Sequence, residues 1–406
     1  MPEVDPFAEL IAPFSRRGVD LGLERIAAAL AELGHPERRF QAVQVAGTNG
    51  KGSIATMVQQ IASAAGIRCG LYTSPHLLSW CERIRLPNGL ISEDELAALL
   101  RQLQPLARRH DLTPFELVTV AGLVAFAEAQ VDLAVLEVGL GGRLDATTVH
   151  PDRQVLAFAS IGLDHTEHLG DTLGAIAYEK AAVMHPGAIA VSGPQHPDVR
   201  AVLQAEAQRL QCELRWCSPL AKEEEGGPRL GLRGDLQRLN GAVALAAIDA
   251  LRSQGWSIPA AAIAQGLLSA RWAGRLERRS FAGKPLLIDG AHNPPAAAAL
   301  RQELSAGPRH WLIGMQRHKD APELLRLLLQ SGDQVRICSL SEHSSWSAEE
   351  LSAELDPHLR QAVAITPAEA DLAANLPWLV DSPQLPVACG SLYLVGALLP
   401  LLKTTD

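Results

Sequence analysis

Short apolar segments that alternate with longer amphipathic ones constrain this fold more than any other sequence feature. Such apolar runs, when turn residues bound them, are typical of strands buried on both faces of a parallel sheet. The segments between them have helical spacing, and Ser92 with Glu95 forms the sequence pattern of a capping box at one helix start. The alternation predicts a doubly wound α/β domain. The expected strands are 42–47, 67–74, 132–139 and 154–162, and the expected helices are 53–66 and 92–110.

A second α/β pattern begins near Lys284. Before it, the chain passes through a charged, glycine-rich stretch at 218–235, expected on the surface, and a helical segment at 240–254. Strand-like and helix-like runs then alternate again up to LPVACG at 385–390. We therefore expect two domains, residues 1–280 and residues 281–406.

Composition excludes several classes of protein. The 406 residues include 36 basic and 45 acidic side chains, a net charge of −9 that argues against nucleic acid as the main partner. No apolar run reaches the ~18 residues of a membrane helix, and the N-terminal residues lack the pattern of an export signal. The six cysteines form no CxxC pair, so we expect them to be reduced. A soluble cytoplasmic enzyme or binding protein is the simplest interpretation.

The segment VAGTNGKGS (45–53) joins the first expected strand to the first expected helix. Glycines let backbone N–H groups approach phosphate oxygens, and a helix N-terminus adds donors and a favourable dipole. Lys51 could reach the β- and γ-phosphates as a compact positive charge. The standard P-loop spacing is not met, because Gly52 follows Lys51 and residue 45 is a valine. Since glycine-rich turns also connect strands and helices without any function, the segment favours phosphate binding but leaves a plain turn open.

Two further expected strands end in charged residues. Glu137 lies in an apolar strand end, and Asp164 with His165 follows the strand at 154–162. An unpaired buried charge is very unfavourable, so Glu137 should be paired or bind a ligand. The carboxyl ends of strands line the ligand crevice of doubly wound folds, which would bring Glu137 and His165 near Lys51. An ordinary loop acid and loop histidine are the simpler alternative, and Mg²⁺ would favour Glu137 over His165.

A similar arrangement occurs in the second expected domain. There Asp289 and His292 follow a strand-like run, and Arg275 precedes it in a basic stretch. Asp-Gly turns are common without any function, and basic stretches are usually solvated surface. These residues carry little weight by themselves.

A series of specific motifs extends along nearly the whole chain. They are DLGLERI (20–26), VAGTNGKGS (45–53), LYTSPHL (71–77), TPFE (113–116), LEVGLGGRLDAT (136–147), LDHTEHLG (163–170), YEKA (178–181), GRLE (274–277), DGAHNP (289–294) and GSLY (390–393). In this order the series resembles the folylpolyglutamate synthase/dihydrofolate synthase family of the Mur ligase superfamily. The resemblance implies an N-terminal P-loop ATPase domain, a smaller Rossmann-like C-terminal domain and an active site between them.

The resemblance also implies site residues. The implied nucleotide-binding residues are Thr48, Asn49, Gly50, Lys51, Gly52, Asn240, Arg275, Asp289 and His292. The implied metal ligands are Ser74, Glu137, His165 and Lys180, and the implied catalytic residues are Lys51, Lys180 and His165. The segments implied to hold a pterin substrate are Asp20, Leu21, Gly22 and Leu23, then Thr113, Pro114, Phe115 and Glu116, then Leu144, Asp145 and Ala146.

The activity that the resemblance implies is ATP-dependent joining of L-glutamate to dihydropteroate or to folates. ATP and two Mg²⁺ ions are the implied cofactors, with a monovalent cation as a further candidate, and we expect a monomer. Lys180 matches a lysine that is carbamylated in the family. Because a lysine must be neutral to take up CO₂, this position needs a partly buried environment that lowers its pKa.

Several residues depart from the family pattern. Gln44 stands where histidine is frequent, Thr148 where asparagine is expected and Ala182 where glycine is expected. His318 replaces an aspartate, and GDLQRLNGA (234–242) differs from the usual segment. The implied phosphate, metal and carbamate positions are intact, so these departures bear on substrate preference more than on activity.

The sequence leaves alternatives open. The segments around residues 20–23, 113–116 and 144–146 favour an enzyme that both makes dihydrofolate and lengthens the glutamate tail. GSLY (390–393) also resembles members that only elongate. A cell-wall ligase of the same superfamily, or a nucleotide-regulated switch, are more distant alternatives. Tail length, linkage and the preferred folate form are not encoded in any recognisable motif.

Overall fold

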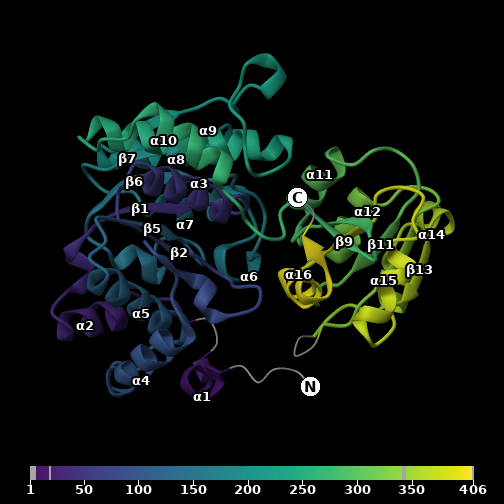
Figure 1. The fold of residues 1–406 in the computed structure, drawn as a ribbon, viewed down its shortest axis with the longest axis horizontal. Helices are drawn as coiled ribbons and strands as arrows, with labels where there is room; N and C mark the ends of the chain where they lie inside the picture. Colours follow the sequence, from purple (N-terminus) through teal and green to yellow (C-terminus); the bar gives the residue numbers. More distant parts are fainter. Residues whose placement is uncertain (1–5, 18–19, 341–343, 405–406) are drawn as a thin grey trace. The chain divides into compact units, whose positions relative to one another are not determined.

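The computed structural model describes residues 6–17, 20–340 and 344–404 (Figure 1). These residues form two compact units. The first unit contains the described residues up to Gly231 together with Gln237–Arg271, and the second contains Leu232–Leu236 and the described residues from Trp272 onward. The expected boundary at residue 280 falls inside strand β9 (Glu277–Phe281), which pairs with a strand of the second unit.

The sheet of the first unit has eight strands in the order β4-β3-β2-β5-β1-β6-β7-β8. Six neighbouring strands, from β2 to β8, are parallel, whereas β3 and β4 are antiparallel and close one edge. The parallel part confirms the expectation of a doubly wound α/β fold. The strands are β1 (Gln41–Ala46), β2 (Cys69–Tyr72), β3 (Ile84–Leu86), β4 (Gly89–Leu90), β5 (Leu133–Glu137), β6 (Arg153–Phe158), β7 (Ile189–Ser192) and β8 (Glu213–Trp216).

Helices cover this sheet because its strands are apolar on both faces. On one face, β1, β2 and β5 pack against α4 and α5, and β6 and β7 pack against α7 and α8, in two apolar clusters. Elsewhere α3 and α10 meet so closely that a Cβ on Gly266 would lie 2.4 Å from the Ile61 Cα. The helices are α1 (Ala8–Ile11), α2 (Glu24–Glu32), α3 (Lys51–Ala64), α4 (Glu93–Arg109), α5 (Pro114–Glu128), α6 (Thr166–Leu169), α7 (Leu173–Ala181), α8 (Pro197–Leu210), α9 (Asp235–Ser253) and α10 (Ala260–Ser269).

The second unit has a seven-stranded sheet in the order β13-β12-β11-β14-β10-β9-β15. Its first five strands are parallel, and β9 and β15 are antiparallel at one edge. Trp311 and three leucines of α12, Leu324, Leu325 and Leu328, are fully buried in its core. Besides β9, the strands are β10 (Lys284–Ile288), β11 (His310–Ile313), β12 (Gln334–Ile337), β13 (Ala364–Pro367), β14 (Val387–Cys389) and β15 (Lys403–Thr404). The helices are α11 (Pro294–Gln302), α12 (Ala321–Leu328), α13 (Ala348–Glu354), α14 (Pro357–Ala362), α15 (Leu376–Leu379) and α16 (Leu392–Leu398).

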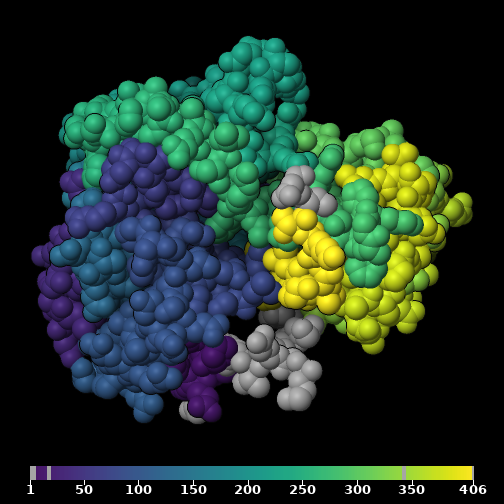
Figure 2. All heavy atoms as spheres, in the orientation of Figure 1, coloured from purple at the N-terminus to yellow at the C-terminus, as the bar shows by residue number. Residues whose placement is uncertain are grey.

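Several local expectations are confirmed. Ser92 and Glu95 form the capping box of α4, with Ser92 Oγ accepting from the Glu95 amide. Residues 221–226 are all exposed, and Figure 2 shows the teal segment around them projecting from the surface. All six cysteines are free. Among the described residues, no helix is both long and apolar enough to cross a membrane.

Candidate active site

The glycine-rich loop between β1 and α3 has the conformation that its glycines permit. Gly47 and Gly50 have φ angles of 139° and 99°, which L side chains rarely adopt. Gly50 is the N-cap of α3, so the first turn of this helix is open toward the loop. A Cβ on Gly50 would lie 2.3 Å from Asn240 Oδ1, which places Asn240 of α9 directly against the loop. The loop therefore offers backbone donors and a helix N-terminus, the combination that binds phosphate.

The loop is held in place by the segment that follows β6. The amides of Thr48 and Asn49 both donate to the Ser160 carbonyl, at 2.8 and 3.1 Å. The Thr48 hydroxyl donates to the Gly162 carbonyl at 3.0 Å. Lys51 Nζ donates to the Thr48 carbonyl at 3.0 Å, so the ammonium lies over the loop. The loop thus lies at the adjacent carboxyl ends of β1 and β6, the edge where doubly wound folds bind ligands.

Glu137 ends β5, the strand that pairs with both β1 and β2. Its side chain is buried, and its Oε2 accepts a hydrogen bond from the Ser74 amide at 3.3 Å. The structure therefore brings Ser74 and Glu137 together at the carboxyl edge of the sheet. Carboxylate and hydroxyl oxygens are ligands that suit Mg²⁺.

Lys180 lies near the end of α7 and is 5% exposed. Burial and, to a smaller extent, the positive charge of Lys51 together lower its pKa to about 7, against opposing contributions from Asp164 and Asp145. The structure thus places Lys180 within electrostatic range of the phosphate-loop lysine. A Cβ on Gly142 would lie 3.2 Å from the Lys180 Cα, so the loop after β5 packs directly on this helix turn. The expected partly buried environment is present.

His165 lies at the N-cap of α6 with a φ of 51°. Its side chain is 40% exposed and lies 3.8 Å from a Glu167 oxygen and 4.0 Å from an Asp164 oxygen. Within the described chain, no three His, Cys, Asp or Glu side chains lie close enough to hold a metal ion by themselves. A metal at this edge would need other donors, such as the Ser74 hydroxyl, a modified Lys180 or nucleotide phosphates.

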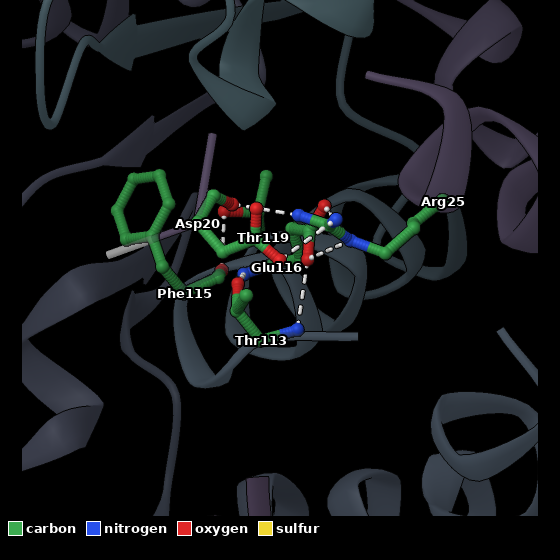
Figure 3. A network of polar contacts seen from close by, with 6 residues as sticks. All are labelled: Asp20, Arg25, Thr113, Phe115, Glu116 and Thr119. Carbon is green, nitrogen blue, oxygen red and sulfur yellow. Dashed lines mark hydrogen bonds and ion pairs between the residues drawn. The ribbon is translucent and has the colours of Figure 1, made fainter. Parts of the chain in front are cut away.

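The residues before α2 and at the start of α5 form one polar network (Figure 3). Glu116 is buried and completes a capping box with Thr113 at the N-terminus of α5. Arg25 Nε donates to both Glu116 oxygens at 3.2 Å, while its Nη1 donates to Asp20 Oδ2 at 3.1 Å. Arg25 therefore joins two segments that are far apart in sequence. Leu21, Gly22 and Leu23, which are half-buried, lie between Asp20 and Arg25 in the sequence.

Phe115 lies beside this network and beside the loop after β5. Its ring packs edge-on to Tyr72 with centroids 6.2 Å apart, and a Cβ on Gly139 would lie 2.6 Å from its tip. In the same loop Asp145 is buried, and both of its oxygens accept hydrogen bonds from the chain. The Asp145 carboxylate therefore shapes the loop that carries Leu144 and Ala146. Pro114 is the first residue of α5 and is half-buried.

The second unit groups Arg275, Asp289 and His292. Asp289 follows β10, and its oxygens accept from the Leu276 and Ala291 amides, each at 2.8 Å. Burial raises the pKa of Asp289, while the charge of Arg275 acts in the opposite direction. A Cβ on Gly290 would lie 2.4 Å from Arg275 Nη1, so the guanidinium lies against this turn. His292 Nδ1 lies 2.8 Å from the Gly290 carbonyl.

Sequence reasoning did not predict the contacts of three residues that shape the first unit's site, although it noted Gln44 as a departure from the family pattern. Arg25 is part of the DLGLERI segment, but its role as a bridge depends on Glu116, 91 residues away. Gln44 and Arg153 are buried and bonded to each other at 2.7 Å, across two adjacent strands. The available signal was a glutamine and an arginine in otherwise apolar strands, where a polar side chain needs a partner.

Comparison with known proteins agrees with this architecture. A family model described as "Dihydrofolate synthetase, C-terminal domain" matches residues 275–401. The chain is 32% identical to the "Probable dihydrofolate synthetase" of Schizosaccharomyces pombe over 95% of this chain and 99% of that protein. The chain belongs to the dihydrofolate synthase/folylpolyglutamate synthase family.

Two solved structures of this family match the chain over nearly its whole length. One is the Escherichia coli protein FolC "in complex with DHPP and ADP", with 28% identity, a TM-score of 0.83 and 99% of both chains covered. The other is the bifunctional folylpolyglutamate synthase/dihydrofolate synthase of Yersinia pestis complexed with AMPPNP and a Mn ion, with 29% identity and a TM-score of 0.84. That match covers 98% of this chain and 99% of the Yersinia chain. The expected family and fold class are thereby confirmed.

Proposed function

We propose that this chain is an ATP-dependent ligase that joins L-glutamate to dihydropteroate and to folates through an acyl phosphate. The observation that carries the proposal is Lys180, a buried lysine with a pKa lowered to about 7 beside the Lys51 of a phosphate-type loop. A buried lysine with a depressed pKa next to a second cation is a marker of chemistry rather than of packing. Both residues lie in motifs of the family to which the chain belongs.

In this proposal the loop at 47–52 binds the ATP phosphates. The first turn of α3, which begins after Gly50, supplies backbone donors, and Lys51 supplies a charge for the β- and γ-phosphates. Thr48 and Asn49 shape the loop around the phosphates, because their amides donate to the Ser160 carbonyl. Asn240, which abuts Gly50, completes the first unit's contribution. Arg275, Asp289 and His292 are assigned to the nucleotide on the second unit, where Asp289 fixes the turn that carries His292.

Two Mg²⁺ ions are proposed near Ser74, Glu137, His165 and Lys180. Bound there, they would neutralise charge on the transferring phosphoryl group. The Lys180 amine, which burial keeps close to neutrality at physiological pH, can attack CO₂ and lose a proton to become a carbamate. This conversion replaces a buried cation by an oxygen ligand, and oxygen is the donor that Mg²⁺ prefers.

The reaction follows from the weakness of a carboxylate as an electrophile. Transfer of the γ-phosphoryl group to the substrate carboxylate gives an acyl phosphate, whose phosphate is a good leaving group. The glutamate amine then attacks the acyl carbon, and phosphate departs from the tetrahedral intermediate. Lys51 holds the charge of the transferring group throughout phosphoryl transfer.

The pterin end of the substrate is assigned to the network around Phe115. The half-buried Phe115 ring offers an apolar wall for a flat heterocycle, and the Asp20–Arg25–Glu116 network fixes the polar segment beside it. This assignment supports acceptance of dihydropteroate as well as folates. Enzymes of the family that carry both activities in their names include the Escherichia coli protein.

One assay tests the proposal and its runner-up, an enzyme that only elongates folates. The purified chain is incubated with ATP, Mg²⁺ and L-glutamate, and with dihydropteroate alone or tetrahydrofolate alone. We expect glutamate-dependent ADP release and a product of the added-glutamate mass with each substrate. If tetrahydrofolate gives a product and dihydropteroate does not, the enzyme only elongates folates. If neither substrate causes glutamate-dependent ADP release, the chain is not a ligase of this kind.

A further inference from the structure

A buried polar chain crosses one sheet face of the first unit between its two apolar clusters. Gln44 in β1 is aligned with Leu136 of β5 and Leu156 of β6, which belong to different clusters. The glutamine side chain is completely buried. Since buried polar groups need hydrogen-bond partners, its position between apolar clusters calls for a specific set of contacts.

The Gln44 amide makes hydrogen bonds through both its oxygen and its nitrogen, and these bonds fix its orientation. Arg153 Nη1 donates to Gln44 Oε1 at 2.7 Å. Gln44 Nε2 donates to Thr147 Oγ1 at 2.9 Å and to Thr148 Oγ1 at 2.8 Å. A primary amide has two N–H donors, and both are engaged. The opposite amide orientation would set an N–H group against the guanidinium, so Arg153 determines which way the amide points.

Each threonine hydroxyl makes a second hydrogen bond, to a residue of the loop after β5. Because both hydroxyls accept from Gln44, their own protons point onward, from Thr147 to Asp145 Oδ1 at 2.6 Å and from Thr148 to the Gly142 carbonyl at 2.7 Å. Asp145 Oδ2 in turn accepts from the backbone amides at the start of the loop, those of residues 139 and 140, each at 3.0 Å. The chain therefore runs from a strand interior to both ends of one loop.

We propose that Gln44 is a positioning residue that sets the conformation of loop 139–148 for the substrate's pterin end. This rests on the proposed function, which assigns residues 144–146 of that loop to the pterin. Gln44 itself lies beneath the loop and acts through the two threonine hydroxyls, since its side chain is fully buried and does not reach the surface. Loss of its donors would remove the hydrogen bond from the Thr147 hydroxyl to Asp145 and the one from Thr148 to the Gly142 carbonyl, and so would shift the loop.

Gln44→Glu is the sharpest test because it keeps the shape and the acceptor for Arg153 but removes both donors. The Thr147 and Thr148 hydroxyls would then turn toward the introduced carboxylate and away from Asp145 and Gly142. We expect the KM for dihydropteroate to rise roughly tenfold, the effect of losing about one hydrogen bond, with the KM for ATP unchanged. Thr147→Val should raise the KM for dihydropteroate similarly, because this substitution removes the hydrogen bond between the Thr147 hydroxyl and Asp145.

Thr56→Val is the matched control. Its hydroxyl is buried in the same unit and has no hydrogen-bond partner among the described residues, so the substitution should leave both KM values unchanged. ADP binding and thermal unfolding of every variant report the fold independently of turnover. The proposal is overturned if both Gln44→Glu and Thr147→Val keep the wild-type KM for dihydropteroate, or if KM rises equally for dihydropteroate and ATP. If the wild-type chain uses only folates, the same comparison is made with tetrahydrofolate, so a failure of the proposed substrate remains distinct from a failure of the positioning role.

Discussion

Each unit buries an ionisable side chain close to its proposed nucleotide site, but the two surroundings differ. In the second unit, Asp289 accepts two backbone hydrogen bonds and faces the opposite charge of Arg275. In the first unit, Lys180 is buried near a second cation, Lys51. Burial disfavours the charged form of both side chains. The Asp289 carboxylate holds a turn through backbone amides, whereas the like charge of Lys51 adds to the effect of burial on the Lys180 cation. A buried group whose pKa is shifted by burial together with a specific charged neighbour is a candidate for chemistry.

The largest expected effect is the loss of the Lys180 amine. Lys180→Ala should abolish turnover and leave the fold intact, because the side chain is proposed to become a metal-holding carbamate rather than a structural contact. Short carboxylic acids added to this variant should restore part of the activity by supplying the missing oxygens. Steady-state kinetics with and without acetate measures both effects.

The control for Lys180→Ala is Lys222→Ala, which removes an exposed lysine of the projecting segment. It should keep wild-type activity. Full activity of Lys180→Ala would exclude the carbamate and would leave the two units alike, each with a buried charge that serves only the fold.

The next effect is expected at Glu137, the buried carboxylate at the end of β5 in the first unit. Glu137→Ala should lower kcat by ~10²–10³, as the loss of one key charge-stabilising group typically does. The concentration of Mg²⁺ needed for half-maximal rate should rise at the same time. A magnesium titration of the rate measures this, and an unchanged Mg²⁺ dependence would remove Glu137 from the metal site.

Asp289 should behave differently because its carboxylate holds backbone amides. Asp289→Ala leaves the Leu276 and Ala291 amides without their partner and should lower the free energy of unfolding of the second unit by about 1–3 kcal/mol. Asp289→Asn keeps one acceptor oxygen and should lose less. Denaturant unfolding followed by tryptophan fluorescence compares the two, and equal stability of Asp289→Ala and the wild-type chain would contradict the structural role.

The sequence predicted β1, β2, β5 and β6 of the first sheet and the parallel strands of the second sheet, because their apolar runs are continuous and short. It missed β7, β8 and the β3–β4 hairpin, although Asn88-Gly89, where the turn enters β4, is a typical hairpin signal. It also missed β9 and β15, because a charged edge strand such as Glu277–Phe281 shows no apolar period and its pairing with residues 403–404 is not local. Such edge strands form because they pair with a strand of the folded sheet, and the hydrophobic periodicity of their own sequence does not reveal that pairing.

The site was harder to predict from residues alone. A Glu-Lys pair in a helix is typical of a surface, so only the family resemblance singled out Lys180 before its burial was known. Arg25 and Gln44 act through residues 91 and 103 positions away in sequence, and no local pattern encodes such partners. The conformation of loop 139–148 depends on contacts of this kind, with Gln44 of β1, so it could not be predicted from the loop's own sequence motif.

The smallest expected effect is on the pH dependence of the free energy of unfolding, to which Lys180 and Asp289 contribute with opposite signs. The folded-state pKa of Lys180 is lowered to about 7 from 10.5, so the unfolded chain binds more protons between these values. Stability should therefore rise with pH in this window and be lost as pH falls toward 7. The raised pKa of Asp289 has the opposite sign: its contribution is present below 3.8 and is lost as pH rises through the folded-state value.

Melting temperatures of metal-free protein in CO₂-free buffer test this contrast between the two units. Lys180→Met should flatten the rise in melting temperature between pH 7 and pH 10 and leave the acid side unchanged. Asp289→Asn should alter only the acid side, because an amide does not titrate. If Lys180→Met kept the wild-type slope above pH 7, the buried amine would be charged in the folded protein. Carbamate formation, which needs the neutral amine, would then lose its physical basis at this position.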